Sequence, residues 1–204
     1  MTLYWKKSQD IQILKENLNK DRVAVVSGDT VLGLLGRMTQ KSYDAINTIK
    51  NRTGKPCLVL IRSAQMLSKF IDQDLDQTVS YIVNNCWPGP LTLIFKAKSS
   101  LPDYMKNSDG TIALRVPNHQ GLLNLLQDYD GLFSTSANLH TENIPKNVQD
   151  INKKIIDQVA AVCLDVENQE FDLVPSTILD CSSGEITIIR EGCCLTDDVR
   201  SLLK

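Results

Sequence analysis

Residues 132–139 read LFSTSANL, a short apolar start followed at once by small polar side chains. Leu132 and Phe133 are typical of a buried strand. The three residues after them, Ser134 to Ser136, all carry hydroxyl groups. Ligand sites in open α/β sheets gather where strands end, so this stretch predicts a site. The stretch alone leaves open a plain turn, because Ser, Thr and Asn often hydrogen-bond their own backbone.

Strands and helices are predicted in alternation along the rest of the chain. Short runs rich in Val, Ile and Leu predict strands at 22–27, 57–61, 91–97, 111–116, 132–134, 160–166, 176–181 and 185–191. Apolar residues at helical spacing predict helices at 10–20, 42–52, 64–71, 74–85, 120–129, 147–155 and in a final helix capped by Thr196. This alternation predicts an α/β fold in which one twisted mixed sheet carries helices on both faces.

Length and composition indicate one folded domain, residues 1–204. The chain has 204 residues, of which 42% are hydrophobic and 23% charged, as in ordinary globular domains. A net charge of −2 and a pI near 5.7 argue against a broad basic surface for nucleic acid. The six cysteines include no CxxC pair, and neither a signal peptide nor a membrane span is found. We therefore expect a cytoplasmic protein with reduced thiols.

Cationic side chains accompany the polar strand ends and predict a central basic cavity. Arg115 and Arg190 lie within predicted strands, and Lys50, Arg52 and Lys55 follow a predicted helix. Phosphates are bound by Arg, Lys and hydroxyl groups, and a carboxylate matches the fork of one Arg. A cavity that combines cations with hydroxyls therefore suits an anion. Taken alone, the Lys-x-Arg pair is more typical of a solvated helix end.

Several common chemistries lack their motifs. The sequence contains neither GxxxxGK[ST] nor GxGxxG, which excludes the common phosphate-binding loops. His119 and His140 are the only histidines, and neither has a GxSxG-like serine partner, so no nucleophile triad is predicted. Clusters with metal-ligand spacing are also missing. We therefore expect any divalent ion to arrive bound to substrate phosphates.

Seven short motifs, taken in order, resemble the threonylcarbamoyl-AMP synthase family of the TsaC/YrdC type. They are SGDTVLGL (27–34), IKNRTGKP (49–56), WPGPLTLIF (87–95), TIALRVP (111–117), STSANL (134–139), PSTILDC (175–181) and IIREG (188–192). The first is similar to the family's P-T-D/E-T-V-Y-G-L, the second to its K-x-R segment and the third to its W-P-G-P-x-T stretch. The resemblance spans nearly the whole chain and implies the short, single-domain YrdC-like form.

The resemblance implies a nucleotidyltransferase that joins L-threonine, bicarbonate and ATP into threonylcarbamoyl-AMP and releases pyrophosphate. Its product would serve threonylcarbamoyladenosine modification of tRNA, with downstream tRNA-modification proteins as partners and Mg²⁺ carried by ATP. The residues implied for threonine are Thr30, Arg115, Ser136 and Ser176. Those implied for ATP are Lys50, Arg52, Lys55, Thr111, Ser134, Asn138, Asn147 and Arg190. We expect electrostatic catalysis through Lys50 and Arg52, without a covalent enzyme intermediate.

Two departures from the family pattern keep other hypotheses open. Leu32 stands where the family has Tyr, and Gly28 stands where it has Thr. The chain could therefore be a catalytically inactive paralogue with the same fold. A third hypothesis is an RNA-binding module, although mild acidity and 5% aromatic content make RNA binding weak. Its candidate cations are Lys50, Arg52, Lys55, Arg62, Arg115 and Arg190.

Overall fold

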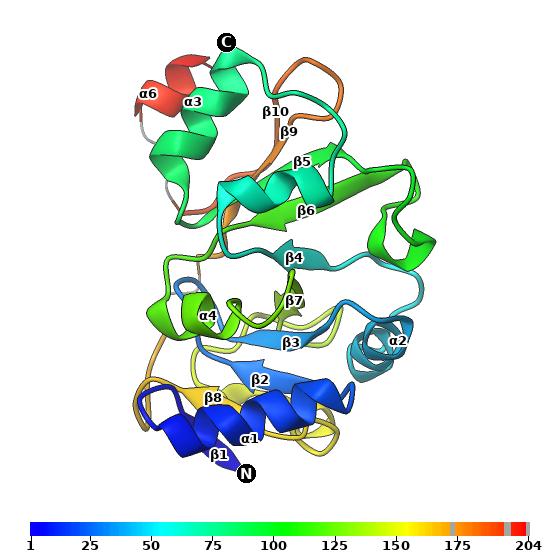
Figure 1. Cartoon of the computed structure of the whole chain (residues 1–204). Coiled ribbons are helices and arrows are strands. Elements are labelled where there is room, and N and C mark those ends of the chain that lie inside the picture. Colours follow the sequence, from blue (N-terminus) through cyan, green and yellow to red (C-terminus); the bar gives the residue numbers. More distant parts are fainter. Residues whose placement is uncertain (172–173, 194–196, 203–204) are drawn as a thin grey trace.

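One mixed sheet organises the molecule (Figure 1). The computed structural model describes residues 1–171, 174–193 and 197–202. Within those residues the sheet has ten strands in the order β1-β8-β2-β3-β7-β4-β6-β5-β9-β10. The strands are β1 (Thr2–Tyr4), β2 (Ala24–Val26), β3 (Gly33–Arg37), β4 (Leu58–Leu60), β5 (Leu91–Lys96), β6 (Thr111–Arg115), β7 (Leu132–Ser136), β8 (Val162–Leu164), β9 (Thr177–Asp180) and β10 (Thr187–Arg190).

Parallel and antiparallel pairs both occur in the sheet. β7 pairs antiparallel with β3 on one side and with β4 on the other. β4 pairs parallel with β6, which pairs antiparallel with β5. β9 and β10 form an antiparallel hairpin, whose turn contains Gly184 at a φ of 85°. The predicted mixed α/β sheet is confirmed, and the stretch LFSTSANL supplies a strand near its middle.

Helices flank the strands on both sides. Among the described residues, the α-helices are α1 (Ser8–Asn19), α2 (Gln40–Ile49), α3 (Gln77–Cys86), α4 (Gln120–Leu125), α5 (Lys153–Ile156) and α6 (Asp197–Leu202). The 3-10 helices are η1 (Ala64–Lys69), η2 (Asp103–Met105) and η3 (Val148–Asp150).

Two helix predictions differ from the structure in detail. The helix predicted at 64–71 is present as the 3-10 helix η1, in which hydrogen bonds close over three residues. The single helix predicted at 147–155 is divided into η3 and α5. Asn147 and Asn152 cause this division, because each side chain accepts a backbone N–H and starts its own short turn. The predicted cap Thr196 lies outside the described residues.

Strands β1 and β3 were not predicted. β1 has three residues, too few to show a pattern. β3 contains Gly33 and Gly36, and glycine is unfavourable inside strands. Packing explains Gly36, because a Cβ there would lie 3.2 Å from Ile46 Cδ1 and 3.3 Å from Ser42 Cβ. The close approach of α2 therefore favours glycine at a position where strand propensity does not.

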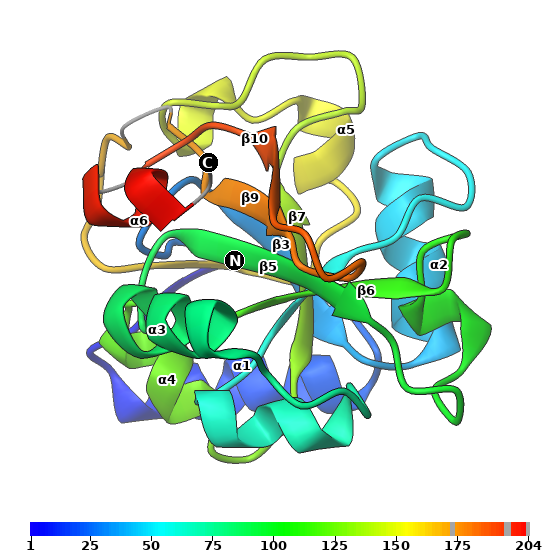
Figure 2. The same cartoon turned by 90° about the horizontal axis from the view of Figure 1, so that it is seen from above.

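Apolar side chains pack against both faces of the sheet. Along β2, Ala24 and Val25 belong to different buried clusters, as the alternation of a strand requires. The cluster of Ala24 includes Leu14 from α1 and Leu122 from α4, whereas that of Val25 includes Ile155 from α5. Figure 2 shows α1 and α4 on one side of the strands and α5 on the other. The predicted covering of both faces by helices is confirmed.

A partly buried polar network joins the ends of β1, β2 and β8 to the start of α4. Trp5 Nε1 donates to Ser27 Oγ at 3.0 Å, and Ser27 Oγ donates to Asp165 Oδ2 at 2.8 Å. His119 Nε2 lies 3.0 Å from Asp165 Oδ1, while Nδ1 accepts the N–H of Leu122. Because Ser27 donates to the carboxylate and not to the imidazole, these residues do not form a nucleophile triad.

Ser27→Ala is expected to lower the free energy of unfolding by about 1–3 kcal/mol, because the buried Trp5 Nε1 would lose its acceptor. Urea denaturation followed by circular dichroism measures this change. The control is Ser99→Ala at an exposed position, for which we expect a change below about 0.5 kcal/mol. Equal denaturation midpoints for the two variants would show that the network does not stabilise the fold.

Candidate functional site

A cavity of about 350 Å³, called the site cavity below, opens beside the C-terminal end of β7. Its volume is within the range of small-molecule sites, about 300–1,000 Å³. Strands from widely separated parts of the chain form its wall, because β6, β4, β7 and β3 are successive neighbours in the sheet. The wall includes the following residues that were predicted to contact substrates: Thr30, Arg115, Ser134, Ser136, Ser176 and Arg190.

Strand alternation brings the hydroxyl groups of Ser134 and Ser136, both on β7, to the cavity. Leu132 belongs to the apolar cluster beneath α1 and α4, and Phe133 belongs to the cluster on the other face. Ser134 and Ser136 therefore continue the face of Leu132. On the neighbouring strand, Gly33 pairs with Ser136, and a Cβ at Gly33 would lie 3.4 Å from Ser134 Oγ. LFSTSANL thus marks the point where one face of the sheet changes from apolar core to cavity wall.

Arg115 is the most deeply buried cation in the wall, with 4% of the residue exposed. Its Nε donates to Gly89 O at 2.9 Å and its Nη1 to Thr30 Oγ1 at 3.1 Å. Nη2 lies 2.7 Å from Asp29 Oδ2 but makes no well-formed hydrogen bond within the described structure. Burial lowers the pKa of Arg115, and the Asp29 carboxylate opposes that effect. A guanidinium with an N–H group still to be satisfied is suited to a carboxylate ligand.

Arg190 and Ser176 form a second polar group in the wall. Arg190 donates to Ser176 O from Nε at 3.1 Å and from Nη2 at 2.8 Å. Ser176 Oγ lies 2.9 Å from Thr92 Oγ1. Burial, and after it the charge of Arg115, lowers the pKa of Arg190. No carboxylate in the described part of the chain forms an ion pair with Arg190, so an anion would relieve the repulsion between the two guanidinium groups.

Lys50 lies directly behind the cavity wall and is 3% exposed. Its Nζ donates to Ser136 O and to Asn138 O at 2.6 Å each, and to Asn138 Oδ1 at 3.2 Å. Burial, and after it the positive charge of Arg52, lowers the pKa of Lys50 to about 8. These contacts are all to neutral oxygens. Lys50 therefore holds the end of β7 in place and adds positive charge behind it.

Arg52 and Lys55 lie beside the cavity and not in its wall. Arg52 Nε donates to Asn47 Oδ1 at 2.8 Å, and its Nη2 lies 3.4 Å from Cys57 Sγ. Cys57 lines the cavity; burial raises the pKa of its thiol, and the charge of Arg52 opposes that effect. Lys55 Nζ lies 2.5 Å from His140 Nε2, and both side chains are exposed. Arg52 thus contacts the wall residue Cys57, whereas Lys55 contacts His140 in the loop after β7.

Three further predicted residues lie outside the wall. Thr111 Oγ1 accepts a hydrogen bond from Asn107 Nδ2 at 2.6 Å, and Asn107 lines the cavity. Asn138 Oδ1 accepts the hydroxyl of the wall residue Ser136 at 2.5 Å. Asn147 caps η3 through its side chain, which accepts the N–H of Asp150 at 3.0 Å, and Asn147 does not line the cavity. Thr111 and Asn138 each hydrogen-bond to a residue that lines the cavity. The ATP-binding roles of Thr111, Asn138 and Asn147 remain predictions.

Several residues at the cavity had no predicted role. Cys57 and Thr92 line the wall, and Asp29 lines a small adjoining recess together with Thr30 and Arg115. Asp29 and Thr92 both lie within motifs that carry the family resemblance, and those motifs could have indicated that the two residues lie near the site. Their contacts are with residues far away in the sequence, and no local pattern reveals such a contact.

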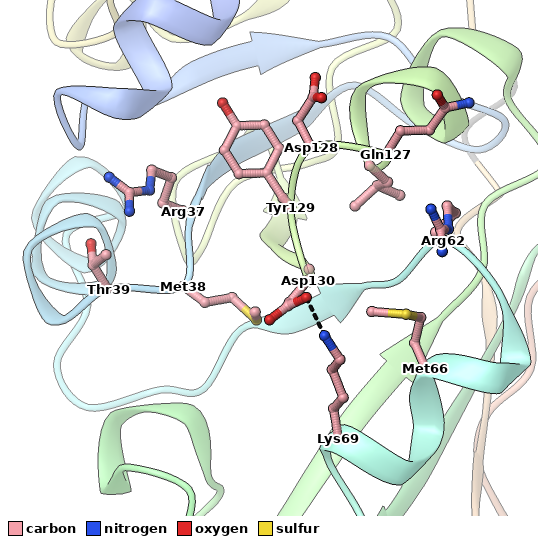
Figure 3. A pocket seen from close by; sticks show the side chains of 12 residues that line it. Arg37, Met38, Thr39, Arg62, Met66, Lys69, Gln127, Asp128, Tyr129 and Asp130 are labelled. Carbon is pink, nitrogen blue, oxygen red and sulfur yellow. Dashed lines mark hydrogen bonds and ion pairs between the residues drawn. The ribbon is translucent and has the colours of Figure 1, made fainter.

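A larger cavity of about 470 Å³ lies at the opposite end of β3 and β7 (Figure 3). Arg62 and Tyr129 line it, and Lys69 pairs with Asp130 at 2.5 Å. No residue predicted to bind threonine or ATP lines this cavity. Arg62 was one of the candidate cations for RNA, and it lines a different cavity from Arg115 and Arg190. The cations considered for RNA therefore do not all line one cavity.

The residues that the structure describes offer no metal-binding cluster, no membrane-spanning helix and no disulfide among the buried cysteines. They contain no group of three or more His, Cys, Asp and Glu residues that could hold a metal ion. No helix among them is long and apolar enough to cross a membrane. Cys57, Cys163 and Cys181 are buried thiols, and none of these three forms a disulfide.

Known proteins of the predicted family are similar to this chain in sequence. The Sua5/YciO/YrdC family model, described as "Telomere recombination", matches residues 16–192. A putative threonylcarbamoyl-AMP synthase of Methanocaldococcus jannaschii is 26% identical over 189 residues, which are 92% of this chain and 87% of that protein. The threonylcarbamoyl-AMP synthase of Photorhabdus laumondii is 27% identical over 179 residues, or 86% and 92% of the two chains.

Solved structures share the fold. P. abyssi Sua5 complexed with L-threonine superposes with a TM-score of 0.86 at 19% identity. The match covers 100% of this chain and 60% of that one, so this chain spans about three fifths of the length of the Sua5 protein. The family model matches most of the sequence, including the region of all seven motifs, and the predicted resemblance is confirmed. The chain therefore belongs to the Sua5/YciO/YrdC family.

Proposed function

We propose that this protein is an L-threonylcarbamoyladenylate synthase, which makes threonylcarbamoyl-AMP and pyrophosphate from L-threonine, bicarbonate and ATP. One observation carries the proposal. A single cavity combines Arg115, a buried guanidinium suited to a carboxylate, with Arg190, a guanidinium that lacks a carboxylate partner in the described chain. The names of the curated relatives and the L-threonine in the Sua5 complex give further support.

The reaction requires several negative charges to meet in one place. The amino nitrogen of threonine bonds to the carbon of bicarbonate with loss of water, which gives a carbamate. A carboxylate oxygen of the carbamate then attacks the α-phosphorus of ATP, and pyrophosphate leaves. Positioning and electrostatic stabilisation are sufficient for such a transfer, so no covalent enzyme intermediate is needed. We assign the electrostatic role to Lys50 and Arg52.

The proposed site divides between the two substrates. Threonine would be bound by Thr30, Arg115, Ser136 and Ser176. ATP would be bound by Lys50, Arg52, Lys55, Thr111, Ser134, Asn138, Asn147 and Arg190. The hydroxyl and guanidinium groups of the cavity wall match anionic oxygens, so Mg²⁺ would enter bound to the phosphates of ATP and contribute positive charge there.

Threonine-dependent release of pyrophosphate tests the proposal. Purified protein with ATP, Mg²⁺ and bicarbonate is expected to release pyrophosphate only after L-threonine is added. Depletion of bicarbonate should also stop the release, because the carbamate could not form. An inactive paralogue would release none under any condition. Release that is independent of threonine would reject the proposed activity.

Arg52→Ala is expected to weaken ATP binding by about tenfold or more, because a charge-assisted hydrogen bond contributes about 1.5–3 kcal/mol. Isothermal titration calorimetry with a non-hydrolysable ATP analogue measures the affinity. The matched control is Arg62→Ala, which removes a cation from the larger cavity and should leave the affinity unchanged. Wild-type affinity in Arg52→Ala would place Arg52 outside the nucleotide site.

The product is a mixed anhydride of a carbamate and a phosphate, so it must pass to a nucleophile soon after release. We propose threonylcarbamoyladenosine formation in tRNA as that next step. Downstream tRNA-modification proteins are then the expected partners, and the cytoplasm is the expected location. Weak RNA binding stays a hypothesis; it would give an affinity that falls steeply as salt is raised.

A further inference from the structure

Asp29 is a carboxylate beside Arg115, and its side chain is 11% exposed. Oδ2 accepts the backbone N–H of Asn118 at 2.7 Å and lies 2.7 Å from Arg115 Nη2. Oδ1 makes no hydrogen bond to any described residue. Asp29 lines the same recess as Thr30 and Arg115. One oxygen of this carboxylate is therefore fixed, and the other has no hydrogen-bond partner among the described residues. The recess measures about 30 Å³ and shares Thr30 and Arg115 with the site cavity, so it adds room for one small group to that cavity.

The charges of Asp29 and Arg115 form a pattern that a ligand can match. Both side chains are largely buried, so each charge interacts strongly with any group that enters the recess. An α-amino acid carries its carboxylate and its ammonium group on one carbon, so the groups that bind them must be adjacent. Asp29 and Arg115 meet this condition, and Nη2 of Arg115 still lacks a well-formed hydrogen bond within the described structure.

We propose that Asp29 binds the amino group of the substrate, so that the pair of Asp29 and Arg115 selects an α-amino acid in its zwitterionic form. This role rests on the proposed function and adds a residue to the threonine site. Arg115 Nη2 donates to the substrate carboxylate, and Asp29 Oδ1 accepts from the ammonium group. The ammonium group first gives up one proton to Asp29 Oδ1, and the neutral amino nitrogen then bonds to the carbon of bicarbonate with loss of water. Asp29 therefore fixes the position of a reacting atom.

Asp29 also separates the two anionic substrates within the cavity. A recess that contained Arg115 alone would bind any anion, including the phosphates of ATP. With Asp29 present, the net charge of the pair is close to zero. Arg190 has no carboxylate partner in the described chain and keeps its positive potential. Phosphates therefore favour the Arg190 side, and the zwitterion favours the Arg115 side.

Calorimetric titration of the wild type and of Asp29→Asn with two ligands tests this role. L-threonine carries the amino group, and 3-hydroxybutanoate has the same carbon chain, carboxylate and hydroxyl group without it. Asp29→Asn should weaken L-threonine binding by at least about tenfold, because a charged hydrogen bond is lost, and should change 3-hydroxybutanoate binding by less than about twofold. Binding of a non-hydrolysable ATP analogue at wild-type affinity or tighter would show that the cavity is intact.

Equal losses for the two ligands would show that Asp29 acts only by holding Arg115, and would overturn the proposal. Unchanged L-threonine affinity would overturn it as well. If Asp29→Asn does not fold, the wild type decides: L-threonine must bind at least about tenfold more tightly than 3-hydroxybutanoate, and equal affinities would overturn the proposal. A folded wild type that neither binds L-threonine nor releases pyrophosphate would instead reject the proposed function itself.

Discussion

Arg115→Ala is expected to raise the Kd of L-threonine by at least about 30-fold, because truncating a buried, hydrogen-bonded charge costs about 2 kcal/mol or more. Arg115 is 4% exposed, and its Nη2 faces a recess with no other cation among the lining residues. The phosphates of ATP are assigned to the Arg190 side, so ATP affinity should change by less than about fivefold. Calorimetry with each ligand separately measures both effects.

Arg190→Ala is the matched comparison, because it removes the other guanidinium of the same wall. Its expected pattern is the reverse, with ATP affinity reduced more than threonine affinity. Equal losses of both ligands in Arg115→Ala would contradict the assignment of Arg115 to the carboxylate. The measurements should be made at low temperature. In Arg115→Ala, Asp29 would remain as an unpaired buried charge and lower the free energy of unfolding by about 3–5 kcal/mol. Adding Asp29→Asn should restore part of that stability.

ATP affinity is expected to fall as the pH is raised from 7 to 9, and Lys50→Met should remove this dependence. Burial lowers the pKa of Lys50 to about 8, so in the free protein its ammonium group is charged at pH 7 and largely neutral at pH 9. Bound phosphates favour the charged form. Binding above pH 8 then requires proton uptake, and affinity should fall by up to about tenfold per pH unit. Calorimetry between pH 7 and 9 measures this slope.

Lys50→Met should bind ATP more weakly than the wild type at pH 7 and should show no further decline between pH 8 and 9. Equal slopes in the two proteins would exclude Lys50 as the source of the pH dependence. Stability gives an independent check. The unfolded chain binds more protons than the folded one between pH 8 and 10.5, so the cost of burying the ammonium group is complete below pH 8 and declines above it.

The general fold was predictable from the sequence because most strands and helices carry a strong hydrophobic period. β7 is an example. Leu132 and Phe133 predicted the strand, and the hydroxyl groups that follow predicted a ligand site at its end, where the cavity lies. β3 was missed because Gly36 serves its packing against α2 and not its own strand propensity. The helix expected at 147–155 was divided by side-chain caps, which a hydrophobic period does not reveal.

The site was partly predictable for a different reason. Polar residues at strand ends suggested Ser134, Ser136 and Arg115, and the sheet order then brought them into one wall. Lys50 was predicted as a cation of the site, and its contacts with the backbone at the end of β7 depend on a long-range approach that the sequence does not show. The ion pair between Asp29 and Arg115 likewise depends on two segments that are far apart in the sequence. Contacts between distant segments are set by the topology, which no local motif encodes.

The most direct measurement is a crystal structure of the protein with L-threonine and a non-hydrolysable ATP analogue. We predict that both ligands occupy the site cavity at the end of β7, with the threonine carboxylate on Arg115 and the triphosphate near Arg190 and Lys50. A nucleotide bound instead in the larger cavity beside Arg62 and Tyr129, or threonine without contact to Arg115, would contradict the central claim that one cavity holds both substrates.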